Sequence, residues 1–192
     1  MMKKKLVLAS ASPRRAELLK QIGVEFETRT VDIDEMPQVD ELPENYVKRL
    51  ALEKARAARL SDQQNEVLVL GSDTAVVIDG DILGKPLDKE HAQSMLRQLS
   101  GKTHQVLTSV ALIGAYESCV ISFSDVTFKI LTDDEIKGYW ATTEPFGKAG
   151  AYAIQGKAAK FIKRLNGSFS GVMGLPLYET SKLLKEHGFI IE

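Results

Sequence analysis

The sequence predicts an α/β fold. Apolar runs of strand length alternate with amphipathic helical patterns along the chain, an order typical of α/β proteins. Residues 104–113 and 119–131 form two long strand-like segments that follow each other closely enough to pair antiparallel. At 192 residues with 44% hydrophobic residues, the chain is long enough to bury a core and to form one domain or two closely packed lobes.

The first half of the chain contains clear boundary signals. Ser12 is a natural N-cap, Pro13 a natural first helical residue, and Gly23 ends the helix that they begin. Asp79-Gly80 is typical of a hairpin turn. The expected elements are a strand at 6–9, a helix at 16–22, a strand at 24–31, a helix from about 42 to 60, strand segments at 67–70 and 75–78 interrupted by 71–74, and a hairpin strand at 81–83.

The second half continues the alternation. Thr132 and Glu135 form a capping-box pattern that begins a helix, and Asn166-Gly167 indicates a hairpin. The expected elements are a helix at 89–99, strands at 104–113 and 119–131, a helix to about 140, a loop at 145–156, hairpin strands at 160–165 and 168–173, a helix at 176–186 and a strand at 189–191. Because no segment reads as a linker, residues 1–192 are expected to form a single domain.

Composition excludes several classes of protein. The net charge of −1 argues against nucleic acid as a partner. A single cysteine, Cys119, rules out a disulfide framework and reads as a small buried hydrophobe in a reducing compartment. The apolar run after the N-terminal lysines is too short for a signal-peptide core, and no stretch has the length of a membrane span. We therefore expect a cytoplasmic protein that does not bind membranes.

The turn after the first strand is the first candidate for function. Residues 10–15 read Ser-Ala-Ser-Pro-Arg-Arg, which places Arg14 and Arg15 in the first turn of a helix. Cations there oppose the helix macrodipole at a cost of roughly 0.3–1 kcal/mol each. Two such residues beside free backbone N–H groups and two hydroxyls predict an anion site, the alternative being a solvated pair on a surface helix.

Two charged residues fall at positions that should be buried. Lys54 lies in the middle of the apolar stripe formed by Val47, Leu50, Ala51 and Ala58, so it either faces inward toward an anion or extends out to solvent. Asp73 lies between two apolar strand segments, where a carboxylate must be paired, bound to metal or protonated. Asp73 is either a structural hydrogen-bonding residue, satisfied by its hydroxyl neighbours, or a catalytic base.

Two glycine-containing loops add further cations. Residues 84–86 read Gly-Lys-Pro, and residues 147–156 read Gly-Lys-Ala-Gly-Ala-Tyr-Ala-Ile-Gln-Gly. Glycine beside lysine lets the backbone approach a ligand closely. In the second loop, Tyr152 could stack on a base or pack the loop, and Gln155 could read the hydrogen-bonding edge of a base.

Together these residues predict a polyanion site with a base. The histidines are dispersed, and neither a nucleophile elbow nor a Walker loop is present. A carboxylate with a clamp of cations indicates attack by water on a phosphoryl centre, assisted by a divalent metal.

The same motifs resemble the Maf family of nucleotide pyrophosphatases. The matching segments are 8–15, 71–74, 84–86, 148–156 and 172–176, in family order and over nearly the whole chain. The resemblance implies an inosine-triphosphatase-like α/β fold, with an elongated mixed sheet and two lobes flanking a central cleft. It also implies hydrolysis of a nucleoside triphosphate to the monophosphate and pyrophosphate, a divalent cation (Mg²⁺ or Mn²⁺), a cytoplasmic location and a possible homodimer.

The resemblance also implies roles for individual residues. Asp73 matches the proton acceptor, and Glu35 matches an acidic cleft position, so that both are expected at the metal. Positions tied to substrate choice match Arg14, Thr74 and Gln155. Positions that contact phosphate or substrate match Ser10, Arg15, Lys54, Lys85 and Lys148. The Ile-Gln-Gly run at 154–156 resembles the subgroup that acts on dTTP and UTP.

Other functions stay open at this point. The same chemistry could act on another nucleotide, such as CTP or 7-methyl-GTP. A non-catalytic nucleotide-binding regulator of septum formation is a different class, against which Asp73 argues: a protein that only binds a polyanion gains nothing from a buried carboxylate beside it.

Overall fold

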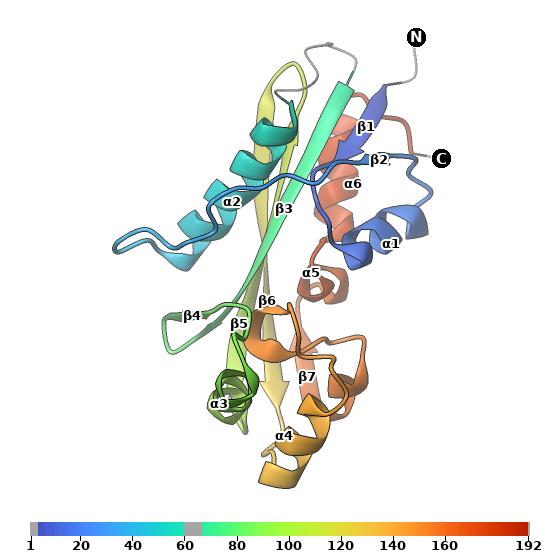
Figure 1. The fold of residues 1–192 in the computed structure, drawn as a ribbon. Helices are drawn as coiled ribbons and strands as arrows, with labels where there is room; N and C mark the ends of the chain where they lie inside the picture. Colours follow the sequence, from blue (N-terminus) through green and yellow to red (C-terminus); the bar gives the residue numbers. More distant parts are fainter. Residues whose placement is uncertain (1–3, 60–66, 192) are drawn as a thin grey trace.

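The computed structural model describes residues 4–59 and 67–191 (Figure 1). Within these residues seven strands form one mixed sheet, in the order β2-β1-β3-β5-β6-β7 with β4 beside β3. β1 pairs parallel with β2 and β3, and the remaining neighbours pair antiparallel. The strands are β1 (Lys5–Leu8), β2 (Glu27–Thr28), β3 (Val67–Ile78), β4 (Asp81–Leu83), β5 (Thr103–Ile113), β6 (Glu117–Phe128) and β7 (Ile162–Asn166). The predicted α/β class and the antiparallel pair at 104–131 are confirmed.

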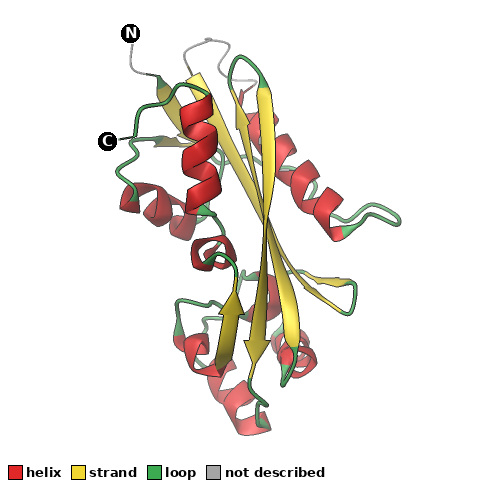
Figure 2. Cartoon of the chain, turned by 180° about the vertical axis from the view of Figure 1, so that it is seen from behind, coloured by secondary structure: helices red, strands yellow, loops and turns green. Residues whose placement is uncertain are grey.

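Three long strands connect two lobes. β3, β5 and β6 run along the length of the elongated molecule, as both views show (Figures 1 and 2). One lobe carries α1 (Pro13–Gln21), α2 (Pro43–Arg59) and α6 (Leu177–Glu186). The other lobe carries α3 (Lys89–Leu99) and α4 (Asp133–Trp140). α5 (Phe169–Met173) lies between the two lobes.

The strand period of two residues divides the first lobe into two cores. Leu68 and Leu70 of β3 join the cluster that contains residues of α1 and α6. Val67 and Val69 join the cluster that contains alanines of α2. Because alternate residues of a strand point to opposite faces, a continuous apolar run is what a strand covered on both faces requires.

The middle of β3 is an open edge of the sheet. On one side β3 pairs with β5 from Val69 to Val77. On the other side β1 pairs only as far as Leu70, and β4 begins to pair at Val76. Residues 71–75 therefore have a neighbouring strand on one side only. At this opening side chains from both faces of β3 can reach the same space.

β3 is continuous, so the predicted interruption at 71–74 is wrong. Gly71 to Thr74 pair with Ala111 to Thr108 of β5 without a break in register. The polar side chains lower local hydrophobicity but do not prevent backbone pairing. Gly71 is required by a close approach of α2, because a Cβ there would lie 2.2 Å from the Ala51 carbonyl oxygen.

Three other expected elements differ from the structure. The strand at 24–31 shortens to β2, after which Arg29 N–H still donates to the Leu8 carbonyl. The second hairpin strand at 168–173 is instead α5, because the Ser168 side chain caps a helix by accepting from Gly171 N–H. Residues 189–191 form no strand in the described part of the chain; Phe189 N–H donates to the Leu184 carbonyl and its ring is buried.

Several smaller expectations can also be compared. α2 is described to Arg59, so the predicted end near Leu60 lies outside the described residues. The capping box of Thr132 and Glu135 is confirmed at the start of α4. Cys119 is partly buried, and burial raises the pKa of its thiol, in agreement with a structural role. No helix of the described residues combines the length and the apolar character needed to cross a bilayer.

Candidate active site

A cleft of about 370 Å³ lies over the open edge of β3. Its walls come from the turn before α1 and the first turn of α1, the loop after β2, α2, β3, the loop after β4, β5, the segment before η2 (Lys157–Phe161), and α5. All ten of the residues that the sequence indicated for the site line this cleft: Ser10, Arg14, Arg15, Glu35, Lys54, Asp73, Thr74, Lys85, Lys148 and Gln155. The structure thus brings together residues that are far apart in the sequence.

A row of alternating charges forms one wall. Lys54 is buried on α2, and its Nζ lies 2.7 Å from Asp73 Oδ1 and 2.7 Å from Glu35 Oε1. Lys85 Nζ reaches Glu35 Oε2 at 2.9 Å from the loop after β4. Lys54 therefore faces inward, and of the two alternatives left by its position in the apolar stripe, the buried one with an anion partner is confirmed.

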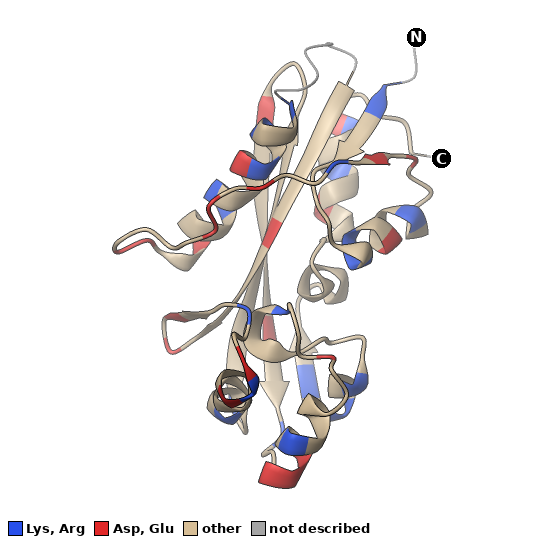
Figure 3. Cartoon of the chain, in the orientation of Figure 1, with Lys and Arg blue, Asp and Glu red and all other residues tan. Residues whose placement is uncertain are grey.

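The two carboxylates have different proton affinities. Burial raises the pKa of Asp73, although Lys54 and Arg15 act against that rise. Burial also acts to raise the pKa of Glu35, but hydrogen bonds from Lys54 and Lys85 outweigh it and bring that pKa to about 2. Glu35 is thus a firmly ionised carboxylate, whereas Asp73 has the higher proton affinity that suits a base. Figure 3 marks an acidic residue midway along β3, and Asp73 is the acidic residue of that strand.

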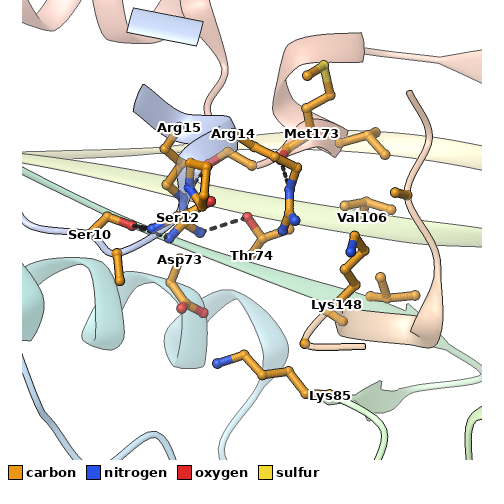
Figure 4. Close-up of a pocket in the computed structure, with 18 of the residues that line it drawn as sticks. Ser10, Ser12, Arg14, Arg15, Asp73, Thr74, Lys85, Val106, Lys148 and Met173 are labelled. Atoms are coloured by element: carbon orange, nitrogen blue, oxygen red, sulfur yellow. Dashed lines mark hydrogen bonds between the residues drawn. The ribbon is translucent and has the colours of Figure 1, made fainter. Parts of the chain in front are cut away.

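The two arginines are held by carbonyl groups from a remote segment. Arg15 Nε donates to the Gly174 carbonyl at 2.8 Å, across 159 residues of sequence, and Arg14 Nε donates to the Met173 carbonyl at 3.4 Å. Arg15 also donates to Ser10 Oγ at 3.2 Å and to Thr74 Oγ1 at 3.3 Å. Figure 4 shows both arginine side chains on one side of the Asp73 carboxylate, with Lys85 on the opposite side.

Burial lowers the pKa of both arginine side chains. For Arg15, the nearby Asp73 carboxylate acts in the opposite direction and Arg14 adds to the decrease. Two adjacent, partly desolvated guanidinium groups repel each other, so an anion placed between them gains more than it would beside a single solvated arginine.

Sequence reasoning missed the residues that support this site from behind. Thr108 Oγ1 lies 3.0 Å from Thr74 Oγ1 and donates to the Gly171 carbonyl at 2.7 Å. Ser72 Oγ donates to the Gly174 carbonyl at 3.0 Å. Gly174 itself has a φ of +121°, which favours glycine. The family-like segment 172–176 was the available signal, but nothing in the local sequence connects it with Arg15 or β3.

The opposite wall belongs to the segment that carries Lys148 and Gln155. Lys148 is half-buried beside Arg14, and burial lowers the pKa of its ammonium group. Gln155 is exposed at the cleft. Tyr152 is buried in the core: its hydroxyl lies 2.9 Å from His104 Nε2, and its ring packs edge-on against Phe128. Of the two interpretations of Tyr152, packing of the loop is therefore the one that the structure supports.

The donor set suits a hard divalent cation shared with a substrate. Glu35 and Asp73 each place an oxygen 2.7 Å from the same Lys54 ammonium, so the two carboxylates lie close together in the cleft, on either side of that ammonium. Among the described residues, no cluster of three or more His, Cys, Asp or Glu side chains is arranged for a metal. Mg²⁺ commonly binds through one or two carboxylates together with substrate phosphates, and this pair fits that pattern.

Relatives of this chain share nearly its whole length. A dTTP/UTP pyrophosphatase of Xanthomonas euvesicatoria pv. vesicatoria is 52% identical over 187 residues, covering 95% of this chain and 98% of that protein. The dTTP/UTP pyrophosphatase of Alkalilimnicola ehrlichii is 54% identical over 185 residues, covering 94% and 92%. That of Escherichia coli strain K12 is 50% identical over 189 residues, covering 97% and 95%.

A solved structure and a family pattern complete the comparison. A HAM1 protein from Coxiella burnetii matches with a TM-score of 0.55 at 17% identity, covering 96% of this chain and 100% of that one, which confirms the expected fold class. The sequence pattern of the family described as Maf-like protein matches residues 5–187. With this match and relatives at 50% identity or more, the chain belongs to the Maf-like protein family.

Proposed function

We propose that this protein hydrolyses nucleoside triphosphates to the monophosphate and pyrophosphate, with dTTP and UTP as its preferred substrates. The observation that carries the proposal is a buried carboxylate, Asp73, placed at an open sheet edge among five cationic side chains in one cleft. Three relatives that cover more than nine-tenths of this chain bear the name dTTP/UTP pyrophosphatase, which supports both the proposed reaction and the proposed nucleobases, thymine and uracil.

Asp73 acts as the general base. Its raised pKa means that the ionised carboxylate binds a proton more strongly than an ordinary aspartate, and a stronger base is a better acceptor for the proton of an attacking water. Lys54, at 2.7 Å from Oδ1, holds the carboxylate in place and favours its ionised form against the effect of burial. The second carboxylate oxygen is then the one that takes the proton.

The cations bind the phosphate chain. Arg15 is oriented by the Gly174 carbonyl and by two hydroxyl groups, so its planar fork is fixed before the substrate arrives. Arg14, Lys85 and Lys148 approach the same space from other segments. Because the negative charge of a phosphoryl group shifts during transfer, groups fixed in advance stabilise the transition state without reorganisation.

A divalent cation is part of the proposal, with Mg²⁺ or Mn²⁺ as the ion and Asp73 and Glu35 as its protein ligands. When bound, such an ion neutralises phosphate charge and polarises the phosphoryl oxygens. Glu35, with a pKa of about 2, is ionised at every pH at which the protein would work, so it is available as a ligand without loss of a proton. Lys54 and Lys85 hold that carboxylate at the mouth of the cleft.

Gln155 recognises the base. A side-chain amide offers both a donor and an acceptor, which matches the imide edge of uracil or thymine. Cytosine replaces an acceptor carbonyl with a donor amine, so a site fixed for uracil leaves polar groups unpaired with cytosine, and such sites select strongly.

A panel of nucleoside triphosphates tests the proposal directly. The protein is incubated with dTTP, UTP, CTP, ATP, GTP and 7-methyl-GTP in the presence of Mg²⁺ or Mn²⁺, and the release of monophosphate and pyrophosphate is measured. We expect dTTP and UTP to give the highest kcat/KM. Release of orthophosphate in place of pyrophosphate would show a different bond to be cleaved, and binding without turnover would favour a regulator.

A further inference from the structure

Glu144 is a carboxylate that the proposed chemistry does not use, yet it organises one wall of the cleft. Its Oε1 accepts a hydrogen bond from the Tyr139 hydroxyl at 2.7 Å and from Ala158 N–H at 3.3 Å. Its Oε2 accepts from Lys157 N–H at 2.9 Å. Tyr139 in turn accepts from Ala153 N–H at 3.2 Å. One carboxylate therefore holds, directly or through Tyr139, the backbone on both sides of Gln155.

The neighbouring backbone is shaped to admit this carboxylate. A Cβ at Gly156 would lie 2.3–2.4 Å from the Glu144 carboxyl atoms, so glycine at that position leaves the space that they occupy. On the other side, Thr143 has a φ of +62°. A β-branched residue is strained in that conformation and stays there only when its surroundings impose it. Both features bring Glu144 close to the segment that carries Gln155.

Glu144 is also in its charged form. Burial acts to raise the pKa of its carboxyl group, but hydrogen bonds from Lys157 N–H, the Tyr139 hydroxyl and Ala158 N–H outweigh it and lower the pKa. Hydrogen bonds to an ionised acceptor are stronger than those between neutral groups, so the segment is held more firmly than a neutral side chain could hold it.

We propose that Glu144 is a positioning residue for substrate selection: through Tyr139 and the N–H groups of Ala153, Lys157 and Ala158, its carboxylate fixes the segment from which Gln155 contacts the base. The inference rests on the proposed role of Gln155 in base recognition. It assigns Glu144 no contact with substrate and no part in bond cleavage.

The test compares variants by their ratio of kcat/KM for UTP to that for CTP. Glu144→Gln keeps the size of the side chain and removes one acceptor oxygen. Gly156→Ala displaces the same carboxylate while adding only a methyl group at a residue with negative φ. Glu135→Gln is the matched control, because Glu135 is a carboxylate in the same lobe that also accepts a backbone N–H, but its hydrogen bonds are to Lys129 and Thr132 and not to the segment that carries Gln155.

Both test variants are expected to lower the UTP/CTP ratio roughly tenfold, mainly through a higher KM for UTP, as a displacement of about 1 Å can do. Glu135→Gln should keep the wild-type ratio. In a Gln155→Ala background, Glu144→Gln should leave the ratio unchanged, because residues that act through one another are not additive. Amide hydrogen exchange over 153–158 should rise in Glu144→Gln and not in Glu135→Gln.

Two results would overturn the inference. The first is a wild-type UTP/CTP ratio of kcat/KM in both Glu144→Gln and Gly156→Ala. The second is that Glu144→Gln lowers this ratio equally in the wild-type and the Gln155→Ala backgrounds, which a merely structural role would produce. If Glu144→Gln does not fold, the UTP/CTP ratio of Gly156→Ala alone decides whether the inference holds. A wild-type protein that releases no pyrophosphate from any nucleotide overturns the proposed function, whereas a selective wild type with unchanged variants overturns only the role of Glu144.

Discussion

The two ends of the cleft are built in different ways. At the proposed phosphate end, three of the functional side chains lie on regular elements: Arg15 on α1, Lys54 on α2 and Asp73 on β3. Glu35, Lys85 and Lys148 reach the same space from loops. At the proposed base end, Gln155 lies outside the regular helices and strands, on a segment interrupted by short 3₁₀ turns. The sheet and its covering helices therefore position the central residues of the phosphate end, whereas side-chain hydrogen bonds to a loop position the base end.

Electrostatics separates the same two ends. The phosphate end couples cations and carboxylates closely, with Lys54 between Asp73 and Glu35. The base end offers a neutral amide. Phosphoryl transfer requires charged groups whose positions are fixed before the reaction. Selection among nucleobases requires hydrogen-bonding groups, and these can sit on a loop whose position changes without moving the charged groups. Changes at the two ends should thus separate turnover from selectivity.

The largest effect is expected for Asp73→Asn. The change keeps the shape of the side chain and removes the group that accepts the proton, and a general base contributes about 10²–10⁴-fold. Turnover of dTTP should therefore fall at least about a hundredfold. Circular dichroism and thermal unfolding should show that the variant is still folded. Turnover within a few-fold of the unmodified protein would remove Asp73 from the role of base.

Arg15→Lys should have the next largest effect. Lysine keeps the charge but cannot donate simultaneously to the Gly174 carbonyl and to phosphate in the fork geometry of arginine. We expect kcat/KM to fall by roughly tenfold to a hundredfold, as misplacement of a substrate-positioning group does. Arg14→Lys, whose hydrogen bond to Met173 is longer, should lose less. Unchanged kinetics in both variants would contradict the clamp.

Gln155→Ala tests the base end by itself. The UTP/CTP ratio of kcat/KM should fall by roughly tenfold, because the site loses its hydrogen-bonding discrimination, while turnover of UTP changes only a few-fold. Steady-state kinetics with the two nucleotides measures both quantities. An equal loss of turnover for UTP and CTP would place Gln155 with the chemistry and not with the base.

The smallest expected effect concerns pH. A general base works in its ionised form, so kcat/KM should fall as the pH drops through the pKa of Asp73. Burial raises that pKa above the ordinary value of 3.8, so the acid limb should lie above pH 3.8. Glu35, with a pKa of about 2, cannot give rise to that limb. Because the Glu35 charge also raises the pKa of Asp73, Glu35→Gln should shift the limb to lower pH in a profile of kcat/KM.

Much of the phosphate end could be predicted from the sequence. The pattern Ser12-Pro13-Arg14-Arg15 correctly placed two arginines in the first helical turn. The position of Lys54 in an apolar stripe predicted that it either pairs with an anion or extends to solvent, and the structure decided for pairing. Asp73 was identified because it breaks a hydrophobic run, although the strand itself continues through it. Local patterns of burial and capping carry this information, because they depend on residues a few positions apart.

The base end and its support could not be predicted in this way. The glycines of the loop indicated a ligand, but the brace from Glu144 and Tyr139 depends on a helix end and a loop that meet only in the folded chain. Tyr152 had two open interpretations, and its burial against Phe128 and His104 chose between them. Similarly, Ser168 could not be recognised as a helix cap from the hairpin-like pattern around Asn166-Gly167.

By itself, the sequence determined the α/β class, the order of most elements, and the residue types that a phosphoryl-transfer site needs. The tertiary structure decided where these residues meet. The cleft exists because β1 stops pairing with β3 at Leu70 and β4 starts at Val76, which leaves an edge of β3 open. Arg15 gains its orientation from Gly174, 159 residues away. Periodicity reports which face of an element is buried, but contacts between remote segments arise only when the sheet order and its register are set.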